Sequence, residues 1–146
     1  MKKAARALIF NGDTMLVMER NKHGSQYITL VGGRVDSEET VEQALIREVK
    51  EETGLVVTSQ KLVFIEEHPE PYNQQYIYLC TVESMKDVAI QPYAEESLMN
   101  RIDLNTHRPV WVNVSSLANL PFRTPQLLQA IISSLKNGFP ERPVKL

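Results

Sequence analysis

Three glutamates, Glu48, Glu51 and Glu52, lie within one stretch of the chain that has helical character. Residues three and four apart fall on the same side of a helix, so these carboxylates are predicted to share one face. Like charges held so close repel one another, and a helix selected only for stability would avoid the arrangement. Hard divalent cations prefer oxygen ligands, and Mg²⁺ is typically held by one or two carboxylates together with water and substrate phosphates. The trio therefore indicates a divalent-metal site.

Residues on either side of the trio would help to build such a site. Arg47 is placed to reach Glu51 one turn further on and Glu39 in the preceding loop, and these contacts would hold the acidic side chains in position. Gly32 and Gly33 precede the helix, where a backbone without Cβ atoms can turn sharply and bring its carbonyl groups close to a ligand. We therefore predict a structural role for Gly32 and Glu39 and a metal-ligand role for Gly33.

The helix that carries the trio is well marked in the sequence. Thr40 and Gln43 form a capping box, which predicts the helix start, and the chain then runs to Thr53 without glycine or proline. Gly54 follows as a left-handed C-cap, which is a structural role. The other side of the helix is apolar and is predicted to face the core through Leu45, Ile46 and Val49.

Apolar runs predict the strands. Residues 4–10 and 14–18 are predicted to pair across Asn11-Gly12-Asp13, since Asn-Gly between two apolar runs is a strong hairpin signal. The run over residues 75–82 is nearly continuous, which is typical of a strand covered on both faces. Further strands are expected at residues 27–31, 55–65 and 110–114.

The carboxyl-terminal half is predicted to contain a long loop and a second helix. Residues 83–108 are polar and irregular, and a mobile loop is expected there. Thr124 and Pro125 predict the start of a helix that ends before Gly138. Strands and helices interleaved in this way favour a mixed sheet between helical layers.

The spacing of the acidic segment matches a known motif in full. From Gly33 to Leu55 the sequence follows G-x5-E-x7-R-E-U-x-E-E-x-G-U, where U is an aliphatic residue, with every fixed position filled. This motif is the Nudix box, and the chain resembles the MutT/Nudix hydrolases in motif and in strand order. The resemblance implies an α/β Nudix fold, an α/β/α sandwich with a central mixed β-sheet, as a single domain over residues 1–146 with the box at 33–55.

The resemblance also implies an activity, the hydrolysis of the diphosphate linkage in a nucleoside diphosphate derivative with Mg²⁺ or Mn²⁺ as cofactor. Glu48 and Glu52 match the main metal ligands of the family, and Glu51 matches a further ligand or the general base. The base could instead come from outside the box, where the candidates are Glu83, Glu95 and Glu96. The predicted catalytic residues are Arg47, Glu48, Glu51 and Glu52, and the predicted metal ligands are Gly33, Glu48, Glu51 and Glu52.

The sequence constrains the substrate less tightly. ADP-ribose or a nucleotide sugar is the first choice, followed by a dinucleoside polyphosphate and an oxidised (d)NTP. Pro71 and Tyr72 lie near the positions where the family carries markers for ADP-ribose and for dinucleoside polyphosphate substrates, so they favour neither. Predicted substrate contacts are Arg20, Arg34, Tyr72, Glu95 and Glu96, and a solvated surface role is the alternative for the charged ones.

A second function class also has to be considered. Some relatives keep the Nudix fold, lose the catalytic glutamates and serve as nucleotide-sensing modules without catalysis. The intact set of glutamates in this chain favours the enzyme over this non-catalytic binding module.

Composition limits the partners. The 146-residue chain has a formal net charge of −2 and no cluster of Lys and Arg, which argues against binding a nucleic acid polymer. No window approaches the roughly 20 apolar residues of a membrane span. Cys80 is the single cysteine, so no internal disulfide can form and a cytoplasmic location is favoured; in its apolar strand it is predicted to be a buried hydrophobe. A small-molecule nucleotide is the expected partner, and the resemblance allows a homodimer.

Overall fold

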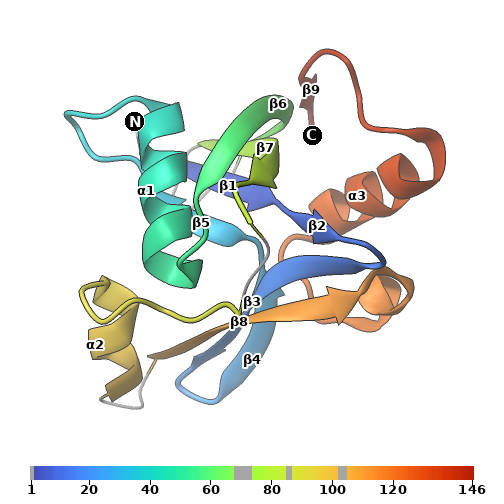
Figure 1. The fold of residues 1–146 in the computed structure, drawn as a ribbon. Helices are drawn as coiled ribbons and strands as arrows, with labels where there is room; N and C mark the ends of the chain where they lie inside the picture. The colour runs from blue at the N-terminus through green and yellow to red at the C-terminus, as the bar shows by residue number, and fades with distance from the viewer. Residues whose placement is uncertain (1, 68–73, 85–86, 102–104) are drawn as a thin grey trace.

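The computed structural model describes residues 2–67, 74–84, 87–101 and 105–146. Two sheets lie at its centre (Figure 1). β1 runs parallel to β7 and β9 runs parallel to β6 in the first sheet, while its other neighbouring strands are antiparallel. This five-stranded mixed sheet consists, in order, of β5 (Val31–Arg34), β1 (Lys3–Leu8), β7 (Gln74–Val82), β6 (Val57–Glu67) and β9 (Val144–Lys145).

The second sheet is antiparallel and is built around β3 (Thr14–Lys22). β3 pairs with β2 (Phe10–Asn11), with β4 (Ser25–Thr29) and with β8 (Asn105–Asn113). The pairing of β3 with β8 extends along the whole of both strands. The second sheet therefore depends on contacts between segments far apart in the sequence.

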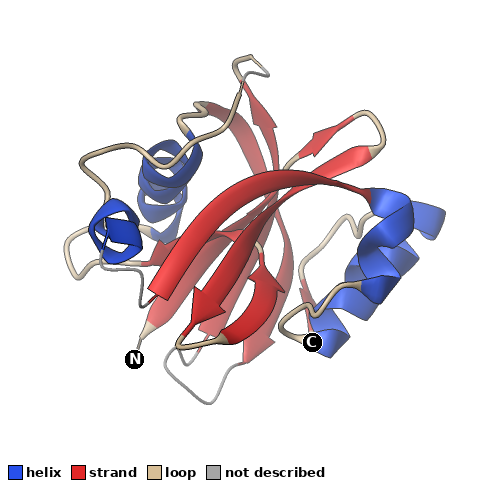
Figure 2. Ribbon diagram, turned by 90° about the horizontal axis from the view of Figure 1, so that it is seen from below, coloured by secondary structure: helices blue, strands red, loops and turns tan. Residues whose placement is uncertain are grey.

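Helices cover both sides of the strands. α1 (Val41–Thr53) and α2 (Glu95–Arg101) lie on one side and α3 (Pro125–Asn137) lies on the other (Figure 2). A short 3₁₀ helix, η1 (Val114–Asn119), follows β8. The bounds of α3 match the predicted second helix. Within the described part of the chain, no helix is both long enough and apolar enough to cross a membrane.

Alternate residues of the central strands enter two different cores. Ala7 of β1 belongs to the same buried cluster as Leu45 of α1, whereas the next residue, Leu8, belongs to the cluster that contains Ile131 of α3. Successive side chains of a strand point to opposite faces, so β1 is covered by a helix on each side. The predicted α/β/α sandwich with a central mixed sheet is confirmed.

α1 begins and ends where the sequence predicts. The backbone N–H of Gln43 donates to Thr40 Oγ1 at 3.1 Å, and the backbone N–H of Thr40 donates to Gln43 Oε1 at 2.8 Å. Gly54 has a left-handed conformation, with φ +82°, and its N–H donates to the carbonyl of Lys50 at 2.8 Å. These local caps fix the helix along which the box glutamates are spaced. Of the three residues predicted to face the core, Leu45 and Val49 are buried, but the prediction for Ile46 is wrong because its side chain is exposed.

The predicted pairing of the first two strands is wrong in part. The hairpin forms, but it joins the short β2 to β3, with Asn11 opposite Thr14. β1 pairs with β5 and β7 instead. A hairpin signal is local and fixes only the residues beside the turn, so it does not determine the partners of the preceding strand. The predicted strand at 27–31 is similarly divided between β4 and β5, which belong to different sheets.

The predicted loop over residues 83–108 is also wrong in part. α2 lies within it, and β8 begins at Asn105 rather than at residue 110. The side chain of Asn100 joins the two elements, because its Nδ2 donates to the carbonyl of His107 at 2.8 Å and its Oδ1 accepts from the N–H of His107 at 2.5 Å. These contacts are tertiary, so the local pattern carries no signal of them.

Cys80 is buried, as predicted, with 6% of its surface exposed. Burial raises the pKa of its thiol to about 12. Since the thiolate is the reactive form, we expect no labelling of the native protein by an aromatic disulfide reagent at pH 8, and one equivalent of labelling after unfolding in guanidinium chloride. The absorbance of the aromatic thiolate released from the reagent measures the extent of labelling in the native and in the unfolded protein. Rapid labelling of the native protein would show that Cys80 is not buried in β7.

Candidate metal centre

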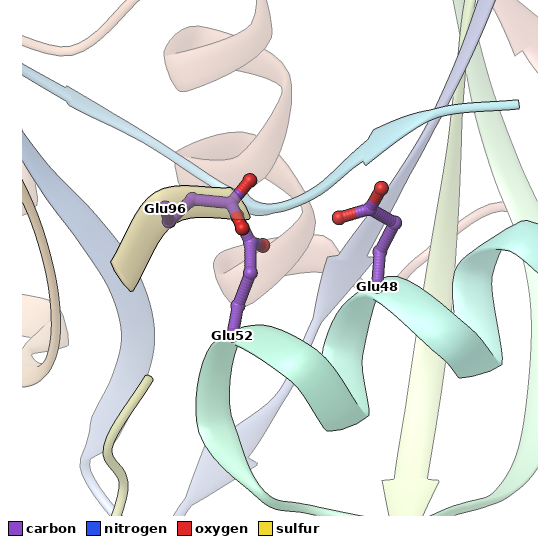
Figure 3. A group of neighbouring side chains, drawn as sticks. All are labelled: Glu48, Glu52 and Glu96. Atoms are coloured by element: carbon purple, nitrogen blue, oxygen red, sulfur yellow. The ribbon is translucent and has the colours of Figure 1, made fainter. Parts of the chain in front are cut away.

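Three carboxylates from two helices meet in one place (Figure 3). Glu48 and Glu52 come from α1 and Glu96 comes from α2, and one oxygen of each lies within 4.8 Å of the others. Glu48 and Glu52 are buried, with 8% and 3% of their surface exposed. Among the residues that the structure describes, this is the one group of three or more acidic, histidine or cysteine side chains close enough to share a metal ion.

Two glycines of β5 let the backbone approach these carboxylates. The N–H of Gly32 donates to Glu52 Oε1 at 2.6 Å. Gly32 has φ +134°, and a Cβ atom there would lie 2.0 Å from the carbonyl oxygen of Ala5. A Cβ atom on Gly33 would lie 2.7 Å from the carboxyl carbon of Glu48. The position of Gly32 therefore needs glycine, whereas a side chain at Gly33 would displace the carboxylate of Glu48.

Arg47 connects the acidic residues of the box to one another. Its Nε and Nη2 donate to the two carboxylate oxygens of Glu39, at 3.1 and 2.6 Å. Its Nη1 donates to Glu48 at 2.9 Å and to Glu51 at 3.3 Å, and its Nη2 also donates to the carbonyl of Arg34 at 3.1 Å. These hydrogen bonds from Arg47 lower the pKa of Glu39. The contacts that the sequence predicts for Arg47, to Glu39 and to Glu51, are both present.

Glu51 lies apart from the three clustered carboxylates. Its side chain is 23% exposed and pairs with Arg47. The structure thus brings together two of the three predicted glutamates, Glu48 and Glu52, and adds Glu96 from outside the box. Glu51 lines a neighbouring cavity with Tyr93.

Burial and repulsion from neighbouring carboxylates make Glu48 and Glu52 hard to ionise. Burial, with Glu96 and Glu51 adding repulsion, raises the pKa of Glu48 to about 7 even though Arg47 opposes the shift. Burial and the charges of Glu96 and Glu48 raise the pKa of Glu52 well above its usual value. A cation at this place would reverse both effects, since it would stabilise the ionised form.

The donor set fits a hard divalent cation. Two buried oxygens of the cluster, Oε2 of Glu48 and Oε1 of Glu96, accept no hydrogen bond within the described chain. Buried polar atoms without a partner are uncommon in proteins and require an explanation. Carboxylate oxygens are the ligands of Mg²⁺ and Mn²⁺ rather than of softer metals. Such an ion, together with the water that it holds, would supply the partners that these atoms lack.

Three adjoining cavities surround the cluster. The central one has a volume of about 210 Å³ and is lined by Glu48, Glu52 and Glu96 together with Gly32 and Gly33. A cavity of about 620 Å³ shares two lining residues, Arg20 and His107, with the central one. A cavity of about 570 Å³ shares Arg34, Glu48, Glu95 and Glu96 with it. The two larger cavities have no lining residue in common, so each adjoins a different part of the central one.

The predicted substrate contacts fall in different places. Arg20 stands between the central and the 620 Å³ cavities, where its Nη2 donates to Asn105 Oδ1 at 2.8 Å. Arg34 and Glu95 stand between the central and the 570 Å³ cavities. Tyr72 lies outside the described residues. Glu83, a candidate base, lines none of the three cavities.

Two ionisable residues that the sequence analysis did not select, Arg6 and His107, also line the central cavity. Arg6 is a charged residue between two alanines of β1, which is a signal that the sequence does contain. His107 lies in the segment without a readable pattern, where no local signal exists. Burial, with a contribution from the charge of Arg20, lowers the pKa of His107 to about 4, so the imidazole is neutral at physiological pH.

Comparison with known proteins agrees with the fold and the motif. The "NAD-capped RNA hydrolase NudC" of Shigella flexneri is 31% identical over 80 residues, which are 55% of this chain and 31% of the relative. The chain therefore spans about a third of the length of this curated relative. A NUDIX hydrolase from Nitrosomonas europaea has a TM-score of 0.70 at 20% identity, covering 94% of this chain and 90% of that one. An ADP-ribose pyrophosphatase from Streptococcus suis 89-1591 has a TM-score of 0.64 at 23% identity, covering 99% and 96%.

The family follows from a broader match. The family model of the NUDIX domain matches residues 1–131, which include every element of the described structure from β1 to the middle of α3. The resemblance predicted from the box at 33–55 is thereby confirmed, and this chain belongs to the NUDIX domain family.

Proposed function

We propose that this protein is a hydrolase that depends on Mg²⁺ or Mn²⁺ and cleaves the diphosphate linkage of a nucleoside diphosphate derivative. The observation that carries the proposal is the group of buried Glu48 and Glu52 with partly buried Glu96, in which two carboxylate oxygens lack a hydrogen-bond partner among the described residues. Family membership supports the same reaction class. A small-molecule nucleotide is the proposed partner.

Glu48 and Glu52 would hold the metal, with Glu51 and the carbonyl of Gly33 as further ligands. Mg²⁺ or Mn²⁺, when bound, neutralises charge on diphosphate oxygens and makes a neighbouring water more acidic. Arg47 keeps the acidic side chains of α1 in place through its contacts with Glu39, Glu48 and Glu51. The proposed catalytic residues of the box are therefore Arg47, Glu48, Glu51 and Glu52.

Glu96 is the proposed acceptor of the proton from the attacking water. It comes from α2, outside the box, and its Oε1 is buried without a hydrogen-bond partner in the part of the chain that the structure describes. Glu95 lines the same central cavity but is exposed, and Glu83 lines none of the three cavities. A general base must come within hydrogen-bond reach of the water that it deprotonates, and this requirement favours Glu96.

The arrangement of the cavities favours a substrate with a bulky group at each end of the diphosphate. The central cavity suits the diphosphate, and the cavities of about 620 and 570 Å³ fall in the size range of small-molecule sites. Arg20 and Arg34 stand at the two junctions, where guanidinium groups would bind phosphate oxygens. ADP-ribose or a nucleotide sugar has two such ends, whereas a (d)NTP has one.

A substrate panel tests both the reaction and the substrate. With Mg²⁺ or Mn²⁺ present, we expect ADP-ribose or a nucleotide sugar to give a kcat/KM about ten-fold or more above that of any (d)NTP, and chelation by EDTA to abolish turnover. Chromatography of the products identifies the bond that is cleaved. Exclusive turnover of (d)NTPs would contradict the two-ended substrate.

The panel should include two further arms. The name of the NudC relative suggests an NAD-capped RNA as one arm; we expect free nucleotides to be preferred, since the chain has no cluster of Lys and Arg. The second arm is calorimetric binding of each compound, because binding without turnover would favour the non-catalytic sensing module. Cytoplasmic location and a homodimer stay predictions.

A further inference from the structure

A carboxylate far from the metal centre is fully buried. Glu66 of β6 has 0% of its surface exposed. It accepts a hydrogen bond from Nε2 of Gln75 at 3.3 Å and another from the hydroxyl of Thr124, the residue that precedes α3. A buried carboxylate is costly unless it is hydrogen-bonded, so these partners are needed. The role proposed above for the metal centre does not account for the presence of an acid here.

Glu66 belongs to a chain of hydrogen bonds that leads to the metal centre. Gln75 Oε1 accepts from Nε of Arg6 at 2.8 Å. Nη1 of Arg6 donates to the carbonyl of Gly32 at 3.0 Å and to that of Leu30 at 3.3 Å. The N–H of Gly32 in turn donates to Glu52 at 2.6 Å.

The register of the first sheet explains how this chain forms. Gly32, Arg6, Gln75 and Glu66 lie on β5, β1, β7 and β6, which are adjacent in that order. Arg6 is directly opposite Gly32, and Gln75 is directly opposite Glu66. Polar side chains therefore cross the sheet in a row through a layer that is otherwise apolar.

Gly32 needs such external support. Glycine has no side chain to pack, so its backbone has more freedom than that of any other residue. Its position is fixed by Arg6 at its carbonyl and by Glu52 at its N–H. Any movement of Gly32 would displace the hydrogen bond that orients the carboxylate of Glu52.

We propose that Arg6, Gln75 and Glu66 are positioning residues, which fix Gly32 and thereby orient Glu52 for metal binding. The proposal rests on the metal-dependent function proposed above. Arg6 also lines the central cavity, so its replacement would have mixed effects. Gln75 and Glu66 line none of the three cavities, and they are the residues to change.

Gln75→Leu removes the link between Glu66 and Arg6 at nearly constant volume. We expect Mn²⁺ binding, measured by calorimetry, to weaken about ten-fold and kcat to fall by a similar factor. This is the lower end of the loss typical when the direct partner of a metal ligand is removed, because Gln75 acts on Glu52 through Arg6 and Gly32. KM for the substrate at saturating Mn²⁺ should stay unchanged, because Gln75 does not line the cavities. In metal-free protein, the backbone amide signal of Gly32 in a nitrogen–proton correlation spectrum should shift.

Tyr78→Phe is the matched control. Tyr78 lies on the same strand, and its hydroxyl donates to Glu42 at 2.9 Å, away from the metal centre. Its replacement also removes one hydrogen bond, but it should leave Mn²⁺ affinity, kcat and the Gly32 signal unchanged.

A double exchange, Glu66→Gln with Gln75→Glu, tests whether these two residues orient Glu52 or only stabilise the fold. Gln75→Glu alone places two carboxylates side by side in the interior and should impair metal binding. The double variant gives Arg6 a carboxylate partner and gives that carboxylate an amide donor, so every hydrogen bond of the row can form again. We expect Mn²⁺ affinity and kcat within about three-fold of the unmodified protein.

The outcomes separate the two proposals. If the unmodified protein neither binds Mn²⁺ nor hydrolyses any compound of the panel, the proposed function fails and the positioning role fails with it. If it does both, but folded Gln75→Leu matches Tyr78→Phe in Mn²⁺ affinity and kcat, only the positioning role is overturned. Should Gln75→Leu not fold, failure of the folded double variant to restore Mn²⁺ binding would overturn it.

Discussion

Replacing Glu52 with glutamine is expected to reduce kcat by about a thousand-fold or more and to weaken Mn²⁺ binding at least ten-fold. Glu52 is almost fully buried in the carboxylate cluster, and its charge is the property that a metal ion would use. Glutamine keeps the shape of the side chain and an oxygen that can accept from the N–H of Gly32. Steady-state kinetics and calorimetry measure the two losses.

The same substitution should not destabilise the fold. Burial and the charges of Glu96 and Glu48 raise the pKa of Glu52, so its ionised form opposes folding when no cation is present. Glu52→Gln removes that charge, and the metal-free variant should melt at the same temperature as the unmodified protein or higher. Glu42→Gln, on an exposed position of the same helix, is the control and should retain full activity. Unchanged turnover in Glu52→Gln would refute the metal-ligand role.

Gly32→Ala is expected to have the largest effect on stability. The residue has φ +134°, and the new Cβ atom would lie 2.0 Å from the carbonyl oxygen of Ala5 on the neighbouring strand. The Cβ atom would clash with backbone atoms of the neighbouring strand and not with a flexible side chain, so nothing can move away easily. Strain of this kind costs about 3 kcal/mol or more, which corresponds to a fall in Tm of about 10 °C for a chain of this size. Urea denaturation measures the loss.

Gly12→Ala separates the close contact from the general cost of replacing a glycine. Gly12 also has a positive φ, +58°, but a Cβ atom there would meet nothing within 4 Å. Its replacement should cost only about 1 kcal/mol, the penalty for a left-handed residue. Equal losses in the two variants would show that the contact with Ala5 does not constrain β5.

The part of the site that could be predicted is the part encoded locally. Thr40, Gln43 and Gly54 fix the ends of α1, and helical spacing then places Glu48 and Glu52 on one side. Glu51 has the same spacing, yet its carboxylate pairs with Arg47 and does not join the cluster. Sequence spacing predicts which residues share a face of a helix. Which of them join the cluster depends on the other contacts that each side chain makes.

The rest could not be predicted because it depends on contacts between distant segments. Glu96 reaches the cluster because Asn100 joins α2 to His107, and neither the helix nor this junction has a local pattern. The row from Arg6 to Glu66 requires the register of four strands. Arg6 is visible in the sequence as a charged residue between two alanines, whereas Glu66 stands beside Glu67 in a strand with several polar residues. The link between them through Gln75 has no signal in the sequence.

The delivery of carboxylates from two separate helices has a thermodynamic consequence. An ion held between α1 and α2 would add a link between two helices whose carboxylates repel each other at this point. Anything that binds the assembled arrangement but not the separated one shifts the balance towards the assembled form by mass action. Binding of the cation and packing of α2 against α1 are then linked. A higher concentration of the cation would favour the form in which the two helices are packed together.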